Sequence, residues 1–138
     1  MFMQFVANNW FLFVALFVVL FLLVWGPLRQ LMYGIHTVTT AEAVRLVNHE
    51  QGVIVDVREV EEFRGGHIPK SINVPLSSLG SKLSQLDKYK ARPVVVCCRT
   101  SQRSMMAAFR LRKNQFANVQ VLARGMIGWQ SDNLPVEK

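Results

Sequence analysis

The segment CCRTSQRS, Cys97 to Ser104, holds the residues of this chain that are best suited to chemistry. It follows the apolar run Val94–Val96 and precedes a helix-like segment that begins near Arg103, so we expect a loop between a strand and a helix. Such a loop points successive backbone N–H groups inward, and the helix dipole adds positive potential at the helix N-terminus. The loop is therefore suited to hold an anionic group.

Cys98 stands at the mouth of this loop, flanked by Arg99 and Arg103. Positive surroundings lower the pKa of a thiol below its ordinary value of about 8.5 and favour the thiolate, which is the nucleophilic form. A buried cysteine that closes a strand is the commoner fate of this residue type, and we expect that role for Cys97. We expect the reactive role for Cys98, because burial would not explain the arginines or the polar run between them.

The first 28 residues carry no charged side chain, and all sixteen Lys and Arg residues lie at or after Arg29. The apolar run 10–28 would be about 27 Å long as a helix, which is enough to cross a bilayer. A tryptophan lies toward each end of it, as interfacial aromatic residues do, and Gly26-Pro27 predicts a break before Arg29. Residues 1–28 are therefore expected to form a retained transmembrane anchor.

A cleaved signal peptide is the main alternative for this segment. It would need a basic N-terminal region and a small-residue cleavage site, and the sequence has neither basic side chains nor an A-x-A pattern before Gly26. Because Arg29 and Arg45 follow the span and no cation precedes it, the positive-inside rule predicts one pass, with the N-terminus outside and the C-terminal domain in the cytoplasm. Cytoplasmic thiols stay reduced, which argues against a structural disulfide.

Residues 29–35 are expected to form a linker, and residues 36–138 show the pattern of a single α/β domain. Thr39 and Glu42 form a capping box that opens a helix. Short β-branched runs then alternate with helical segments, which predicts a parallel sheet covered by helices. The predicted strands are 53–55, 72–74, 93–97 and 119–122, and the predicted helices lie near 59–64, 77–86 and 103–113.

Two segments of this domain are similar to motifs of the rhodanese family. The segment DVREVEEFRGGHIPKSINVP, Asp56 to Pro75, resembles the pattern D-x-R-x-x-x-E-[FY]-x-x-G-H-I-x-x-[AS]-x-[NH]-[IV]-P, and VVVCCRTSQRS resembles the strand and active-site loop. The resemblance extends from about His36 to the C-terminus and implies a rhodanese-like, five-stranded parallel sheet flanked by helices. An apolar helix before one such domain is also similar to membrane-anchored bacterial rhodaneses, which implies the bacterial inner membrane.

Rhodaneses are sulfurtransferases, so the resemblance implies a persulfide mechanism without a cofactor. The thiolate of Cys98 would take the sulfane sulfur of thiosulfate or a related donor and pass it to a thiol or a sulfur-carrier acceptor. The amides that follow Cys98 would hold the persulfide as a nest. Arg103 would either bind the oxyanions of the donor or pair with a neighbouring acid. The expected substrate-binding residues are Arg99, Thr100, Ser101, Gln102 and Arg103.

The sequence departs from the family pattern at three positions. Ser101 stands where the loop usually has glycine, and a residue with a Cβ is strained in a left-handed conformation that glycine adopts freely. Arg124 occupies the first position of a usual Gly-Gly pair, where it could bind anionic donors or be a solvated surface arginine. Cys97 replaces a common aromatic residue and could resolve a Cys98 persulfide, although adjacent cysteines form strained disulfides.

Two other functions are compatible with the sequence. Counted from Cys97, the loop has the C-x5-R spacing of cysteine-dependent phosphatases and arsenate reductases, whose longer cradle fits a phosphoryl group. Val96 stands where phosphatases often place a histidine, which favours the Cys98 register. Alternatively, the domain is a non-catalytic module that binds a partner or an anion at the membrane with an inert loop.

The remaining polar residues have structural interpretations. Asp56 and Arg58 end a central strand and are expected to fasten loops near the site. His67 is expected to hydrogen-bond a turn, because no general base is needed if Cys98 is already a thiolate. The two cysteines and three histidines show no metal-ligand spacing. The net charge is +7, but dispersed cations without an aromatic stacking motif favour lipid head groups and anionic substrates over nucleic acid.

Overall fold

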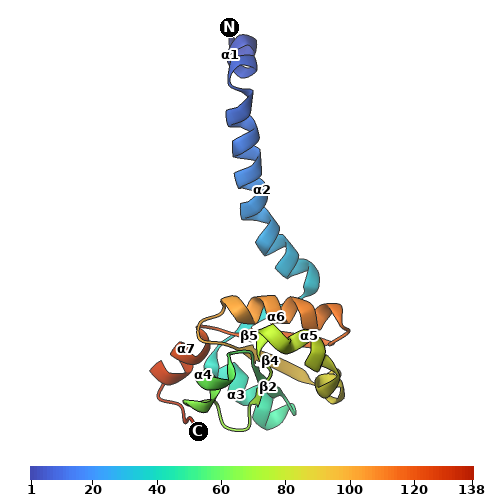
Figure 1. Ribbon diagram of the computed structural model, residues 1–138, viewed down its shortest axis with the longest axis vertical. Coiled ribbons are helices and arrows are strands. Elements are labelled where there is room, and N and C mark those ends of the chain that lie inside the picture. Colours follow the sequence, from blue (N-terminus) through green and yellow to red (C-terminus); the bar gives the residue numbers. More distant parts are fainter. The chain divides into compact units, whose positions relative to one another are not determined.

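A computed structural model describes residues 1–138, which divide into two compact units, Met1–Tyr33 and Gly34–Lys138 (Figure 1). The first unit consists of helix α1 (Phe2–Asn8) and helix α2 (Trp10–Tyr33), and neither helix has a buried residue. By length and composition α2 is able to cross a bilayer, and a signal sequence near an N-terminus has the same two properties.

The break predicted at Gly26-Pro27 is wrong, because α2 continues through Pro27 to Tyr33. A proline removes one backbone donor, whereas the donors of the neighbouring turns are kept, so a long apolar helix can pass through it. The first five residues of the expected linker 29–35 are consequently helical. Gly34 follows with φ +64°, a left-handed conformation that suits glycine at the end of a helix.

The second unit contains a five-stranded sheet in the order β1-β5-β4-β2-β3. Every pair of neighbouring strands is parallel, which confirms the predicted α/β sheet. The strands are β1 (His36–Val38), β2 (Val53–Asp56), β3 (Ile72–Asn73), β4 (Pro93–Cys97) and β5 (Asn118–Leu122).

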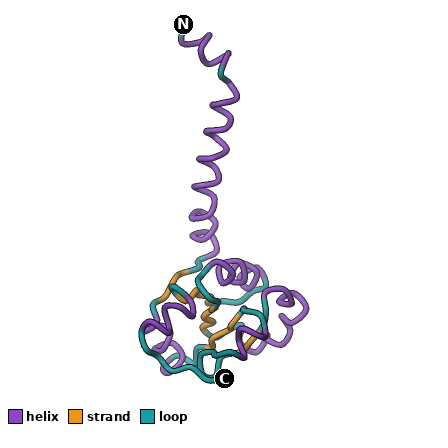
Figure 2. The backbone as a smooth tube through the Cα atoms, turned by 60° about the vertical axis from the view of Figure 1, so that its left-hand side comes forward, coloured by secondary structure: helices purple, strands orange, loops and turns teal.

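Helices cover both faces of the sheet. Helices α5 and α6 lie on one face and α3 and α7 on the other, with the strands between them (Figures 1 and 2). The capping box at Thr39 and Glu42 is confirmed, since each residue accepts the backbone N–H of the other. The helical segments are α3 (Thr40–His49), α4 (Val60–Arg64), η1 (Leu76–Ser78), α5 (Leu79–Lys82), η2 (Leu83–Tyr89), α6 (Gln102–Lys113) and α7 (Gly125–Ser131).

Successive side chains of the central strand β4 point to opposite cores. Val95 and Cys97 belong to the core that α3 and α7 complete with Leu46 and Trp129. By the alternation of a strand, Val94 and its i+2 neighbour face α6 instead. The direction of β4 therefore sends the side chain of Cys97 into a sealed core and leaves the following loop at the edge of the sheet.

Candidate active site

The loop from Cys98 to Ser101 joins β4 to α6 at the carboxyl end of the central strand. Ligands of parallel α/β sheets bind outside the carboxyl ends of the strands, so this is the edge where a site is expected. On one side β4 pairs with β2, whose Asp56 lies opposite Cys97. On the other side it pairs with β5, which leads into α7.

Two backbone N–H groups of helix α7 donate hydrogen bonds to carbonyl groups of the loop. The N–H of Met126 donates to the carbonyl oxygen of Cys98 at 2.8 Å, and the N–H of Ile127 donates to that of Arg99 at 3.2 Å. All peptide bonds are trans, so the N–H in each of these two peptide groups points opposite to its carbonyl. The amides of Arg99 and Thr100 consequently face away from α7.

The amides of residues 99–103 donate no hydrogen bond within the protein. The first bond of α6 comes from the N–H of Met105 to the carbonyl of Ser101, and the Ser101 side chain does not cap the helix. Five consecutive free donors at the positive end of a 12-residue helix form a site for an anion. That these donors converge on the Cys98 sulfur stays a prediction.

The strain expected at Ser101 does not arise. Ser101 has φ −148° and ψ −4°, which is not left-handed, so its Cβ is accommodated in place of the usual glycine hydrogen. The left-handed residues near the site are Arg124 (φ 60°) and Gly125 (φ 53°). A Cβ on Gly125 would overlap the carbonyl oxygens of Cys98 and Thr100, so the close approach of α7 to the loop requires glycine there.

The two cysteines are free and buried. Cys97 is 0% exposed, and burial together with the nearby Asp56 raises the pKa of its thiol, so Cys97 stays neutral. Its thiol donates to the carbonyl of Cys98 at 3.5 Å. Cys98 does not lie at an open mouth, as the sequence suggests, because it is only 1% exposed. Its carbonyl oxygen lies against the turn at Gly125.

Arg103 pairs with an acid. Its two terminal nitrogens donate to the two carboxylate oxygens of Glu62 on α4, at 2.8 and 3.1 Å. This bidentate pair lowers the pKa of Glu62 to about 2. Glu62 is a site residue that the sequence analysis missed, although it is the glutamate of the segment that begins at Asp56, and its i+3 spacing from Glu59 signals a helix start.

Asp56 and Arg58 fasten β2 to the loop that follows it. Arg58 donates to the Asp56 carboxylate at 2.8 to 3.0 Å and to the carbonyl of Gly66 at 2.9 Å, and both side chains are buried. His67 has its ring stacked on Phe63 at 3.7 Å, with Nδ1 at 2.9 Å from the Phe63 carbonyl. These contacts hold chain segments together, which is the structural role that the sequence predicts for the three residues.

Three of the predicted binding side chains are exposed and form no side-chain hydrogen bond or ion pair, namely those of Arg99, Thr100 and Gln102. Arg124 instead runs along α7, where its Nη2 lies 3.3 Å from the Ser131 hydroxyl and its Cδ lies beside Gly128.

Ser104 is fully buried one residue after Arg103, and its hydroxyl is the one buried side-chain polar atom without a partner. No group of three His, Cys, Asp or Glu side chains is placed to hold a metal ion.

The chain is similar to known proteins. The family model of the rhodanese-like domain matches residues 39–132. The uncharacterized protein YibN of Escherichia coli strain K12 is 36% identical over 135 residues, which cover 97% of this chain and 94% of YibN. A sulfurtransferase of Allochromatium vinosum is 32% identical over 92 residues, which cover 67% of this chain and 84% of that protein.

A solved structure shows the same fold. The thiosulfate sulfurtransferase of Pseudomonas aeruginosa matches with a TM-score of 0.68 at 26% identity, over 82% of this chain and 22% of that larger chain. The family match contains β2 to β5, the Cys98 loop and all of α7. This chain therefore belongs to the rhodanese-like domain family.

Proposed function

We propose that the chain is a sulfurtransferase that carries sulfur as a persulfide on Cys98. One observation carries the proposal: five consecutive amides directly after Cys98, Arg99–Arg103, have no acceptor in the protein. Aligned donors of this kind stabilise an anionic sulfur, first the thiolate of Cys98 and then the terminal atom of the persulfide. The names of the Allochromatium and Pseudomonas relatives support the same activity.

The reaction has two displacement steps. The Cys98 thiolate attacks the outer sulfur of thiosulfate; the bond from Sγ to that sulfur forms, the sulfur–sulfur bond of thiosulfate breaks, and sulfite leaves with the electron pair. An acceptor thiolate then attacks the terminal sulfur of the Cys98 persulfide, takes it, and regenerates the Cys98 thiolate. No net oxidant or reductant is required, because the sulfane sulfur moves between two thiophilic groups.

The surrounding side chains divide into two roles. The exposed groups of Arg99, Thr100 and Gln102 bind the oxyanions of the donor, together with the amides that include Ser101. Arg103 is a positioning residue, because its guanidinium is already bound to Glu62 and holds the end of the loop against α4. The side chain of Arg124 would bind a donor only after leaving Ser131.

We further propose that residues 1–28 anchor the domain to the bacterial inner membrane, with the domain of residues 36–138 in the cytoplasm and residues 29–35 joining the two. The absence of charge before Arg29 and the length of α2 support a membrane span. The one-sided cations after the span support this orientation.

Intact-mass spectrometry of the protein after incubation with thiosulfate tests the sulfur chemistry. A gain of about 32 Da, one sulfur atom, is expected in the native chain and in the Cys97→Ser variant, and is expected to vanish in Cys98→Ser. An unchanged mass in the native chain, or a gain that depends on Cys97, would contradict the proposal.

A non-catalytic, membrane-tethered anion-binding module is the second candidate. The burial of Cys98, which is 1% exposed, favours it, because a donor must displace part of the loop to reach the sulfur. Binding of sulfite or sulfate to a Cys98→Ser variant without any sulfur loading of the native chain would support this candidate. A phosphatase that uses Cys97 is disfavoured, since that thiol is neutral and buried in the core. Release of phosphate from an aryl phosphate by the native chain would instead support the phosphatase hypothesis.

A further inference from the structure

The outer face of α6 combines cations with an exposed apolar side chain and contains no acid. The helix holds four Lys and Arg residues and no Asp or Glu. Its sheet-facing side consists of Ser104, Ala107, Ala108 and Leu111, at helical spacing. The opposite side therefore presents Met106, Arg110 and Lys113 outward, a set that we call the α6 outer face.

Arg110 and Lys113 are exposed, and neither forms an ion pair. Met106 is 55% exposed, which is unusual in this domain, where the other exposed large apolar residues are Ile127 and Val136. The remaining cations of α6 have partners: Arg103 binds Glu62, and Arg112 donates to the carbonyls of residues 116 and 117. The α6 outer face thus has two uncompensated positive charges around an apolar centre.

This composition fits a lipid surface. Helices that lie in a membrane interface present an apolar side chain to the acyl boundary and basic side chains to anionic head groups. The cytoplasmic leaflet has a negative surface potential, and the proposed orientation puts the domain on that side.

The chain enters the domain beside α6. Gly34 is the first residue of the domain, and a Cβ built on it would lie 3.9 Å from Nη2 of Arg112. Six residues lead from Leu28, at the end of the charge-free segment, to Gly34. Even a fully extended chain of that length spans only about 20 Å, so the entry beside α6 stays close to the membrane.

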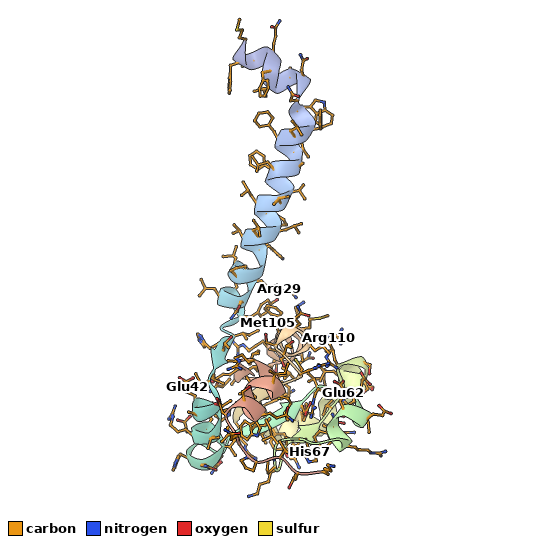
Figure 3. All side chains as sticks on the ribbon, turned by 90° about the vertical axis from the view of Figure 1, so that its left-hand side faces the viewer. Arg29, Glu42, Glu62, His67, Met105 and Arg110 are labelled. Atoms are coloured by element: carbon orange, nitrogen blue, oxygen red, sulfur yellow. The ribbon has the colours of Figure 1, made fainter.

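We propose that the α6 outer face docks on the anionic lipid surface of the membrane that anchors α2. The inference rests on the proposed anchoring and is independent of the sulfur chemistry. Figure 3 shows Arg110 and Met105 of α6 on one side of the domain and His67 on the opposite side. Docking through α6 would therefore leave the His67 side in solution and hold the Cys98 loop, which leads into α6, near the head groups.

Spin labels on the full chain in lipid nanodiscs test this docking. The background is Cys97→Ser with Cys98→Ser, and single labels are placed by Met106→Cys on α6, Ala41→Cys on the exposed side of α3, and Val18→Cys within α2. In nanodiscs that contain phosphatidylglycerol, the label at 106 is expected to lose accessibility to a water-soluble nickel chelate and gain accessibility to oxygen. The label at 41 is expected to stay accessible to the chelate.

Charge-reversal variants test whether the cations of the α6 outer face are required for the docking. Arg110→Glu with Lys113→Glu should return the label at 106 to the aqueous profile, whereas the matched reversal Lys88→Glu with Lys138→Glu, outside α6, should not. Nanodiscs of phosphatidylcholine alone should also leave that label aqueous. The same aqueous profile at 106 in both lipids would overturn the docking, and so would protection from both reagents in both lipids, which would indicate a second copy or another protein on this face. The label at 18 reports the anchor separately.

Discussion

At the scale of single residues, the site depends on which backbone groups form hydrogen bonds within the protein and which do not. The carbonyls of Cys98 and Arg99 are bound by α7, and the amides after Cys98 are unbound. Gly125 makes this possible, because a larger residue would collide with two carbonyl oxygens of the loop. The glycine that matters most for the loop is therefore in α7 and outside the loop itself.

Gly125→Ala is expected to destabilise the domain by about 2 kcal/mol or more, because it adds backbone strain at φ 53° and a steric overlap with the loop. Thermal denaturation measures the loss, and thiosulfate loading is expected to fall with it. Gly80→Ala is the matched control: a Cβ there meets nothing within 4 Å and Gly80 lies in helix α5, so the change should leave the stability unchanged or raise it by up to about 1 kcal/mol. Equal stability of the two variants would contradict the assigned role of Gly125.

At the same scale, the sequence predicts the burial of Cys97 but not that of Cys98. The strand period places Cys97 in the core, and its neutral, buried thiol matches the structural role expected for it. The carbonyl of Cys98 is bound by α7, which is distant in the sequence, so no local sequence pattern predicts this contact. At Ser101 the sequence predicts backbone strain, because related loops have glycine at this position. The strain is absent, because the backbone of Ser101 is not left-handed. Nothing in the structure explains the unpartnered hydroxyl of Ser104.

At the scale of elements, α4 and α6 are joined through the ion pair Glu62–Arg103. The long, periodic elements are predictable: β4 matches its predicted range, and α6 differs from its range by one residue. The sequence analysis missed β1, a three-residue edge strand, and α7, a short helix with two glycines. Both are too short for a hydrophobic periodicity to be recognised in the sequence. Both depend on tertiary contacts for their existence.

The pair Glu62–Arg103 should make stability depend on pH in the acid range. Since the folded pKa of Glu62 is about 2 and its ordinary value is 4.5, the stabilisation is complete above pH 4.5 and is lost as the pH falls through about 2. Glu62→Gln should lower the free energy of unfolding at pH 7 by about 1 kcal/mol at most, because the pair is one-third exposed and screened by solvent.

Denaturant unfolding at pH 7 and at several values between 5 and 2 measures this effect. The difference between the native chain and Glu62→Gln is expected to shrink toward zero at the acid end. Glu61→Gln is the control on the same helix, since the Glu61 side chain is exposed and forms no ion pair. A difference that stays constant with pH would show that the Glu62 charge is not the cause.

At the scale of the whole molecule, the chain consists of an apolar unit, Met1–Tyr33, whose one charged side chain is Arg29, and a basic unit, Gly34–Lys138. Charge begins at Arg29, four residues before the first unit ends at Tyr33. The sequence does not predict that residues 29–33 are helical, because a glycine and a proline precede them and such a pair favours a helix break.

Protease added to the outside of intact spheroplasts is expected to leave the domain of residues 36–138 uncut, because the proposed orientation places it in the cytoplasm. Lysis of the spheroplasts in the presence of the protease is expected to release cleavage products of the domain. Immunoblotting for a C-terminal tag measures both. Loss of the tag in intact spheroplasts would reverse the orientation, and recovery of the tag in the soluble fraction after gentle lysis would favour a cleaved signal peptide.

The contact of Gly125 and Met126 with the Cys98 loop also bears on how related chains should be compared. Two homologues with identical loops can differ in competence if one carries a bulkier residue at the position of Gly125, and two with different loops can behave alike if that turn is kept. A comparison of related chains therefore requires both stretches to be aligned together, since the two are in contact.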